Sequence, residues 1–101
     1  MSTAPTPGHD APPRLRIDKW LWHARVAKTR TLAARLVTDG YVRVNGTRVD
    51  NAAKPVKPGD VLTIALERTV RVYRVVDLGN RRGPASEAQT LFEDVTAAGP
   101  E

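Results

Sequence analysis

The sequence predicts a small α+β domain, in which two helices pack on a mainly antiparallel sheet and a short helix follows near the C-terminus. Two observations predict this class. Apolar residues repeat at helical spacing between residues 17 and 40, and they alternate as in strands between residues 41 and 78. A chain of 101 residues has room for one such domain, so its core is small.

The first helix is expected to begin near Asp18, a residue type that suits the N-cap. An apolar stripe follows at the i, i+3, i+4, i+7 spacing of a buried helix face: Ile17, Trp20, Leu21 and Ala24. Trp20 lies on that stripe and is assigned to the core. Trp22 lies off the stripe, so it either packs beneath the C-terminal segment or offers a base a stacking surface.

The second helix is expected to start at Thr29 as N-cap and to stop at Gly40. Its buried side comprises Leu32, Ala33, Leu36 and Val37. Another face carries Lys28, Thr31 and Arg35 at i, i+3, i+7 spacing. The pattern therefore predicts a helix with one apolar side and one cationic side.

Strands follow over residues 41–44 and 47–49, joined by Asn45-Gly46, a strong signal for a two-residue hairpin turn. Residues 50–60 are expected to form a loop, and residues 61–66 a third strand.

A fourth strand is expected over residues 68–78, with Val70, Val72 and Val76 on one side and Arg71, Tyr73 and Val75 on the other. Ser86 with Gln89 then predicts a capping box for a short acidic helix carrying Leu91 and Phe92.

The positive charge is concentrated in the first half of the chain. The whole chain carries 16 Lys and Arg against 11 Asp and Glu, a net charge of +5. Residues 14–57 hold 11 basic and 3 acidic residues, whereas residues 83–101 hold no basic and 4 acidic ones. Clustered charge of one sign points to an anionic partner, and a solvated face is the alternative.

Several classes of protein are disfavoured by composition. The chain has no Cys, so disulfides and thiolate metal sites are excluded. His9 and His23 are isolated, so no metal and no cofactor are expected. No apolar run approaches a membrane span, and the start lacks the features of a signal peptide, which predicts a cytoplasmic protein. No nucleophile–base set or phosphate loop is visible, so no enzyme activity is expected.

Many residues in register resemble the RNA-binding domain of the ribosomal small-subunit protein four type, the S-four (alpha-L) domain. They cover about 45 residues: Arg16-Ile17-Asp18-Lys19, Leu21, Thr29-Arg30, Ala33, Leu36-Val37, Gly40, Val42, Val44-Asn45-Gly46, Lys54-Pro55 and Gly59-Asp60. This resemblance implies an S-four-like domain over residues 14–80. A disordered, proline-rich tail is expected over residues 1–13, and a C-terminal segment with a short helix and a frayed end over residues 81–101.

Further motifs are similar to the heat-shock protein fifteen family of small stand-alone S-four proteins: Asp18 to Trp22, Lys28 to Arg30, Glu67 to Val70 and Arg81 to Glu87. The resemblance implies binding to ribosomal RNA on the large ribosomal subunit, and to peptidyl-tRNA, during recycling or rescue of subunits that carry a nascent chain, including in heat stress. Longer family members continue into a basic helical extension, whereas the printed sequence ends in an acidic stretch at Glu101.

Affinity for RNA rests on phosphate neutralisation by Lys and Arg, together with helix N-termini and turns that present N–H groups. The expected contact set is Arg16, Lys19, Lys28, Thr29, Arg30, Thr31, Arg35, Arg43, Asn45 and Arg48. Alternatives remain for some members. Arg16 could be merely solvated, Arg30 could pair with Asp18 or Asp39, and Asn45 is first of all a turn residue. Tyr41 is either a rim aromatic at the RNA face or a packing residue.

The leading hypothesis is therefore a monomeric, non-enzymatic RNA-binding factor. One alternative is an RNA-binding accessory subunit of an RNA-modifying or tRNA enzyme. Another is a general nucleic-acid protein that binds DNA as well, since phosphate contacts are shared between the two polymers.

Overall fold

A computed structural model describes residues 13–96 of the chain. The expected tail over residues 1–13 and the frayed end beyond residue 96 therefore lie almost wholly outside the described residues. In chain order the elements are β1 (Leu15–Arg16), α2 (Ile17–His23), α3 (Arg30–Thr38), β2 (Val42–Val44), β3 (Thr47–Arg48), β4 (Pro55–Val56), β5 (Val61–Ala65), β6 (Val70–Val75), α4 (Ala85–Ala88), the 3₁₀ helix η1 (Gln89–Leu91) and β7 (Phe92–Asp94).

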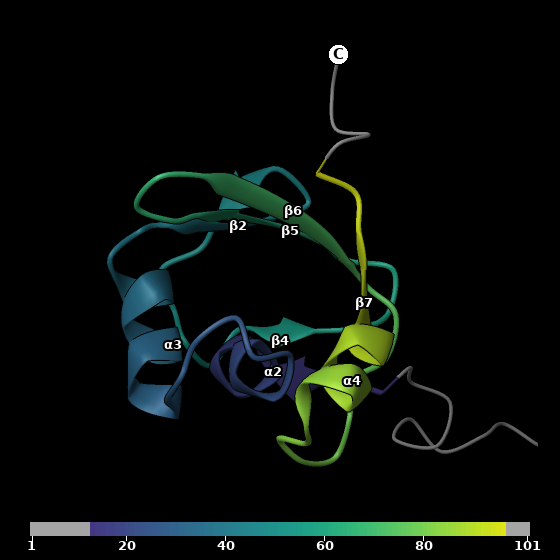
Figure 1. Ribbon diagram of the computed structural model, residues 1–101. Helices are drawn as coiled ribbons and strands as arrows, with labels where there is room; N and C mark the ends of the chain where they lie inside the picture. The colour runs from purple at the N-terminus through teal and green to yellow at the C-terminus, as the bar shows by residue number, and fades with distance from the viewer. Residues whose placement is uncertain (1–12, 97–101) are drawn as a thin grey trace, which may run out of the picture.

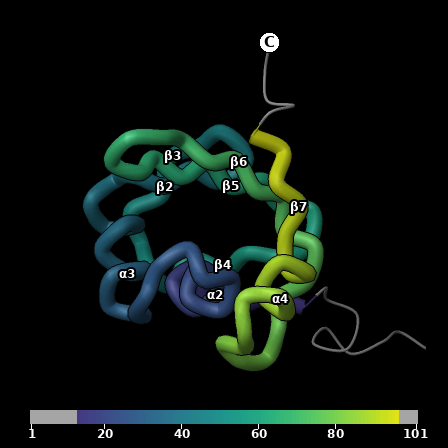
Figure 2. The backbone as a smooth tube through the Cα atoms, viewed as in Figure 1, coloured from purple at the N-terminus to yellow at the C-terminus, as the bar shows by residue number. Residues whose placement is uncertain are grey.

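The α+β class is confirmed. Five strands form one antiparallel sheet in the order β3-β2-β5-β6-β7, and β1 pairs with β4 in a separate two-stranded sheet. In Figure 1 the large sheet forms one layer, and α2 with β4 lies across the core from it. Figure 2 shows that α3 and β7 flank the core on opposite sides, so the backbone closes around it.

The core is built from the predicted apolar stripes of both helices and from the inner face of the sheet. Its fully buried side chains include Ile17, Trp20, Leu21, Ala33, Val37, Val42, Leu62 and Ile64. Trp22 is half-buried and packs against this core, which supports the packing alternative for that residue. Leu32 was expected on the buried side of α3, but it is 45% exposed. The buried stripe of α3 is narrower than predicted and is centred on Ala33 and Val37.

The second helix and the hairpin form as expected. The Thr29 hydroxyl accepts a hydrogen bond of 3.0 Å from the Leu32 N–H, which caps α3. Gly40, with φ +86°, ends the helix in the left-handed region. Asn45 and Gly46 both have positive φ, the requirement of the turn that joins β2 to β3.

The cap predicted for the first helix is wrong. Asp18 lies inside the first turn of α2 and makes no cap hydrogen bond. The N–H groups of Ile17 and Asp18 instead donate to the carbonyls of Lys54 and Ala52, at 2.8 and 3.2 Å. Backbone from residues 50–60 thus satisfies the helix end, and that segment holds strand β4 where only a loop was expected.

The C-terminal segment also differs from prediction in two ways. The helix α4 starts after Pro84 without a side-chain cap, so the capping box is wrong, and Glu87 instead binds Arg81. The helix is also shorter than expected. Leu91 lies in η1, and Phe92 begins β7, which pairs with β6. Among residues 13–96, no helix is long and apolar enough to cross a membrane.

Candidate nucleic-acid interface

A buried carboxylate holds together the starts of the two helices. Asp18 is 3% exposed. Its oxygens accept hydrogen bonds from Nε and Nη2 of Arg16, at 3.1 and 3.0 Å. Nη2 of Arg30, at the start of α3, lies 3.7 Å from the same carboxylate. Two guanidinium groups are therefore anchored side by side on one carboxylate.

Anchoring does not withdraw these two cations from solvent. The side chains of Arg16 and Arg30 remain 52% and 44% exposed. A guanidinium has five N–H donors, so each retains donors for an external acceptor. The proposed pairing of Arg30 with Asp18 is confirmed, and Arg16 is a solvent-exposed residue before the helix that also binds Asp18.

The other cations near the start and middle of α3 form no ion pair within the described part of the chain. Lys28, Thr31 and Arg35 are all exposed. Within residues 13–96 no carboxylate forms an ion pair with Lys28, Arg35 or the half-buried Lys19. The Thr29 hydroxyl accepts the cap bond and so shapes the N-terminus of α3, and its own O–H remains available as a donor.

The hairpin carries two more exposed cations close to the C-terminal end of α3. Arg43 on β2 stands directly opposite Arg48 on β3. A Cβ placed on Gly40 would lie 3.5 Å from both Cδ and Nη1 of Arg48, so this side chain covers the turn after α3. Tyr41, next along the chain, is 51% exposed, which favours the rim-aromatic alternative.

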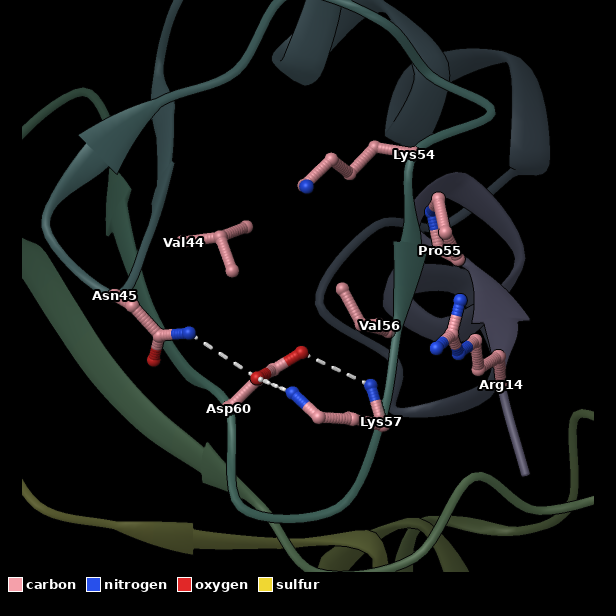
Figure 3. Close-up of a pocket in the computed structure, with 8 residues that line it drawn as sticks. All are labelled: Arg14, Val44, Asn45, Lys54, Pro55, Val56, Lys57 and Asp60. Atoms are coloured by element: carbon pink, nitrogen blue, oxygen red, sulfur yellow. Dashed lines mark hydrogen bonds and ion pairs between the residues drawn. The ribbon is translucent and has the colours of Figure 1, made fainter. Parts of the chain in front are cut away.

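Asn45 has a structural role that uses one donor and one acceptor site of its carboxamide. Its Nδ2 donates to Oδ1 of Asp60 at 3.1 Å, and its Oδ1 accepts from the Val61 N–H at 2.9 Å. Lys57 binds the same Asp60 through Nζ, at 2.9 Å, and through its backbone N–H, at 3.0 Å (Figure 3). The exposed carboxamide keeps a second N–H and a second lone pair, so Asn45 combines this structural role with the expected contact to RNA.

This network changes the acidity of Asp60. Burial raises the pKa of the Asp60 carboxyl, but hydrogen bonds from Lys57 and Asn45 lower it by a larger amount. The pKa therefore lies below the ordinary value of 3.8. A carboxyl with a depressed folded pKa stabilises the fold above its unfolded pKa. That contribution is lost as the pH falls through the lower folded value.

We expect Asp60→Asn to lower the free energy of unfolding at pH 7 by about 1–3 kcal/mol, because a charged hydrogen-bond acceptor is lost. The difference in free energy of unfolding between the variant and wild type should become smaller as the pH falls below 3.8. Urea unfolding at pH 6 and pH 3 measures both effects. A difference that stays constant over this range would contradict the assignment.

The sequence predicts these cations by residue type and offers Asp18 as a partner of Arg30, but it does not indicate that the same carboxylate also binds Arg16. Asp18 was expected to cap the first helix, although it stands only two residues after Arg16, which it binds. Arg14 and Lys54 were not selected, yet both line a hollow beside the hairpin turn (Figure 3). In the described part of the chain, no three His, Asp or Glu residues are grouped so that they could hold a metal ion.

The interface lies within a segment that matches a known domain. Residues 15–62, from β1 to the start of β5, match the family model described as the S4 domain. The chain is 34% identical over 83 residues to the RQC P-site tRNA stabilizing factor of Bacillus subtilis, which covers 79% of this chain and 95% of that protein. It is 40% identical over 80 residues to heat shock protein 15 of Escherichia coli K12, over 79% of this chain and 59% of that protein.

A solved structure shows to which family the chain belongs. The trimeric structure of Vibrio cholerae heat shock protein 15 superposes with a TM-score of 0.76 at 35% identity, covering 81% of this chain and 82% of that one. The chain belongs to the heat shock protein 15 family. It spans about three fifths of the length of the Escherichia coli member.

The match confirms the S4-like fold that the sequence indicated. The S4 domain, residues 15–62, contains all ten residues of the expected contact set. Residues 63–96 complete β5 and add β6, which extends the same sheet, followed by α4, η1 and β7. The Bacillus subtilis relative is named for stabilising P-site tRNA, and the Escherichia coli relative for heat shock.

Proposed function

We propose that this heat shock protein 15 family member is a non-enzymatic, cytoplasmic RNA-binding protein. Its RNA would be structured ribosomal RNA on the large subunit, together with peptidyl-tRNA, during recycling or rescue of subunits that carry a nascent chain, including in heat stress. Support comes from relatives named for heat shock and for P-site tRNA stabilisation. The monomeric state also remains a prediction, and the Vibrio cholerae relative is described as trimeric.

One observation carries the proposal: three arginines beside the acidic C-terminal segment are neutralised, whereas four cations near α3 and on the hairpin are not. Arg71, Arg74 and Arg81 are each paired with a carboxylate of the C-terminal segment, namely Asp94, Glu93 and Glu87. On α3 and the hairpin, Lys28, Arg35, Arg43 and Arg48 form no ion pair with any described residue. The acidic segment therefore neutralises its own neighbours and leaves the S4 surface positive.

Unpaired, exposed cations on rigid elements suit a phosphate backbone. Each phosphate that Lys or Arg neutralises releases counterions, which makes binding strongly salt-dependent. Arginine can also hydrogen-bond a phosphate bidentately or stack on an exposed base. Arg48 covers Gly40 at the C-terminal end of α3, which supports the proposal that the cations near α3 and those of the hairpin bind the same folded RNA.

We expect the double variant Lys28→Gln with Arg35→Gln to bind large subunits more weakly than wild type. The slope of log K against log salt should fall by about 1.4–1.8 in magnitude, because two phosphate contacts are lost. Salt titrations of binding to purified large subunits and to a ribosomal RNA fragment measure this slope.

The matched control is Arg71→Gln with Arg74→Gln, which removes the same charge from two cations of β6 that are paired with Asp94 and Glu93, and it should keep the wild-type slope. Equal slopes for the two double variants would overturn the site assignment. Displacement of the RNA by an equal concentration of duplex DNA would favour a general nucleic-acid protein instead. Recovery of a stoichiometric enzyme without ribosomal RNA would favour an accessory subunit.

A further inference from the structure

Two hollows adjoin each other between the β2–β3 hairpin and residues 50–57. One, of about 240 Å³, is bordered by Arg14 and Lys57 (Figure 3). The other, of about 490 Å³, runs beside Arg48 and Asp50. Both are lined by Val44, Asn45 and Lys54. They therefore make one open groove with Lys54 at its middle.

The groove has a surplus of positive charge. The Lys54 ammonium extends from the edge of β4 into the open space facing Val44 and Asn45 (Figure 3). Within residues 13–96, no carboxylate forms an ion pair with Lys54, Arg14 or Arg48.

Two carboxylates also border the groove. Asp60 is already neutralised, since it binds the Lys57 ammonium at 2.9 Å and the Asn45 amide at 3.1 Å. Asp50 is exposed and lines only the hollow beside Arg48. Three unpaired cations therefore face one unpaired carboxylate, and the surplus charge is greatest around Lys54.

The backbone at Lys54 is held in place by the first helix. Its carbonyl accepts the N–H of Ile17 at 2.8 Å, and its N–H donates to the carbonyl of Asn51 at 3.0 Å. Arg14 stands two residues before Arg16, which Asp18 anchors. The groove thus continues from the cations at the start of α2 and ends at the hairpin cation Arg48.

We propose that this groove binds the phosphodiester backbone of an unpaired RNA segment, with Lys54 as its central contact and Arg14 and Arg48 at its two ends. A positively charged groove that follows the backbone is how proteins hold single-stranded nucleic acid. Its extent over two hollows suits a continuing chain better than a lone anion. The inference rests on the proposed function, and it adds a strand path that the helix surface does not supply.

The test compares Lys54→Met, which keeps the length of the side chain, with Arg14→Gln combined with Lys54→Met. Binding is measured against a ribosomal RNA fragment with an unpaired loop over a salt series. We expect the slope of log K against log salt to fall by about 0.7 for the single variant and about 1.4 for the double, the value for single-strand phosphates. Arg74→Gln, which removes one cation that is paired with Glu93, should keep the wild-type slope.

Lysine acylation with mass spectrometry gives an independent readout. Lys54 should react in the free protein and be protected in the RNA complex, whereas inorganic phosphate alone should not protect it. Equal protection by inorganic phosphate would identify a small-anion site and overturn the proposal. A wild-type slope for both groove variants, with the Lys28 and Arg35 double variant still impaired, would overturn the groove alone. Loss of salt-dependent RNA binding by the wild-type protein itself would instead overturn the proposed function.

Discussion

Replacement of Trp20 by alanine is expected to lower the free energy of unfolding by about 3–5 kcal/mol. Trp20 has no exposed surface. Its ring meets Phe92 edge to face, with 6.4 Å between ring centroids, and its Nε1 donates to the Asp77 carbonyl at 2.9 Å. Small domains are stable by about 5–15 kcal/mol, so this variant should lose a large part of its stability. Urea unfolding followed by circular dichroism measures the loss.

Trp22→Ala is the matched control, because it removes the same side chain two residues away. Trp22 is only half-buried and packs at the margin of the core. Its replacement should therefore cost clearly less than that of Trp20. Equal losses for the two tryptophans would contradict the placement of Trp20 at the centre of the fold.

The second large effect is expected for Asp18→Asn. The substitution removes the carboxylate that anchors Arg16 and Arg30, and hydrogen bonds between charged groups contribute about 1.5–3 kcal/mol each in such settings. We expect a loss of stability in this range. Affinity for RNA should fall as well, although the variant carries one more net positive charge, because the two guanidinium groups are no longer held side by side.

Asp39→Asn separates these two effects. It makes the same change of charge at an exposed position that follows α3. If charge alone governs binding, both variants should bind RNA at least as tightly as wild type. Tighter binding by Asp18→Asn would rule out the anchoring role.

The helix α3 shows which features can be predicted from sequence. Its cap at Thr29, its buried residues Ala33 and Val37 and its stop at Gly40 all depend on neighbours within a few residues. The same holds for the Asn45-Gly46 turn, which requires only positive φ. Local physical chemistry is enough for such elements.

Features that depend on distant segments escaped prediction. Strands β1 and β4 have two residues each, too few for any periodicity. The cap of α2 comes from backbone carbonyls of Ala52 and Lys54, which leave no trace in the side-chain pattern. Strand β7 was taken for the end of a helix, because the apolar pair Leu91 and Phe92 fits both structures.

The same limit applies to the candidate interface. Residue types sufficed to select Lys28, Arg35, Arg43 and Arg48, and the structure leaves all four without an ion pair in its described part. No sequence pattern indicates that the Lys54 side chain enters a groove beside the hairpin. That placement depends on the pairing of β4 with β1, which joins residues far apart in sequence.

The contact between Trp20 and the C-terminal part of the chain has a consequence for biosynthesis. The indole of Trp20 finds its hydrogen-bond acceptor 57 residues later, at Asp77, and its aromatic neighbour at Phe92. During translation, Trp20 of α2 therefore stays without its aromatic neighbour until β7 has been synthesised. Contacts between such distant residues form late and slow the folding of small domains. The core around Trp20 therefore cannot be completed before Phe92 has left the ribosome.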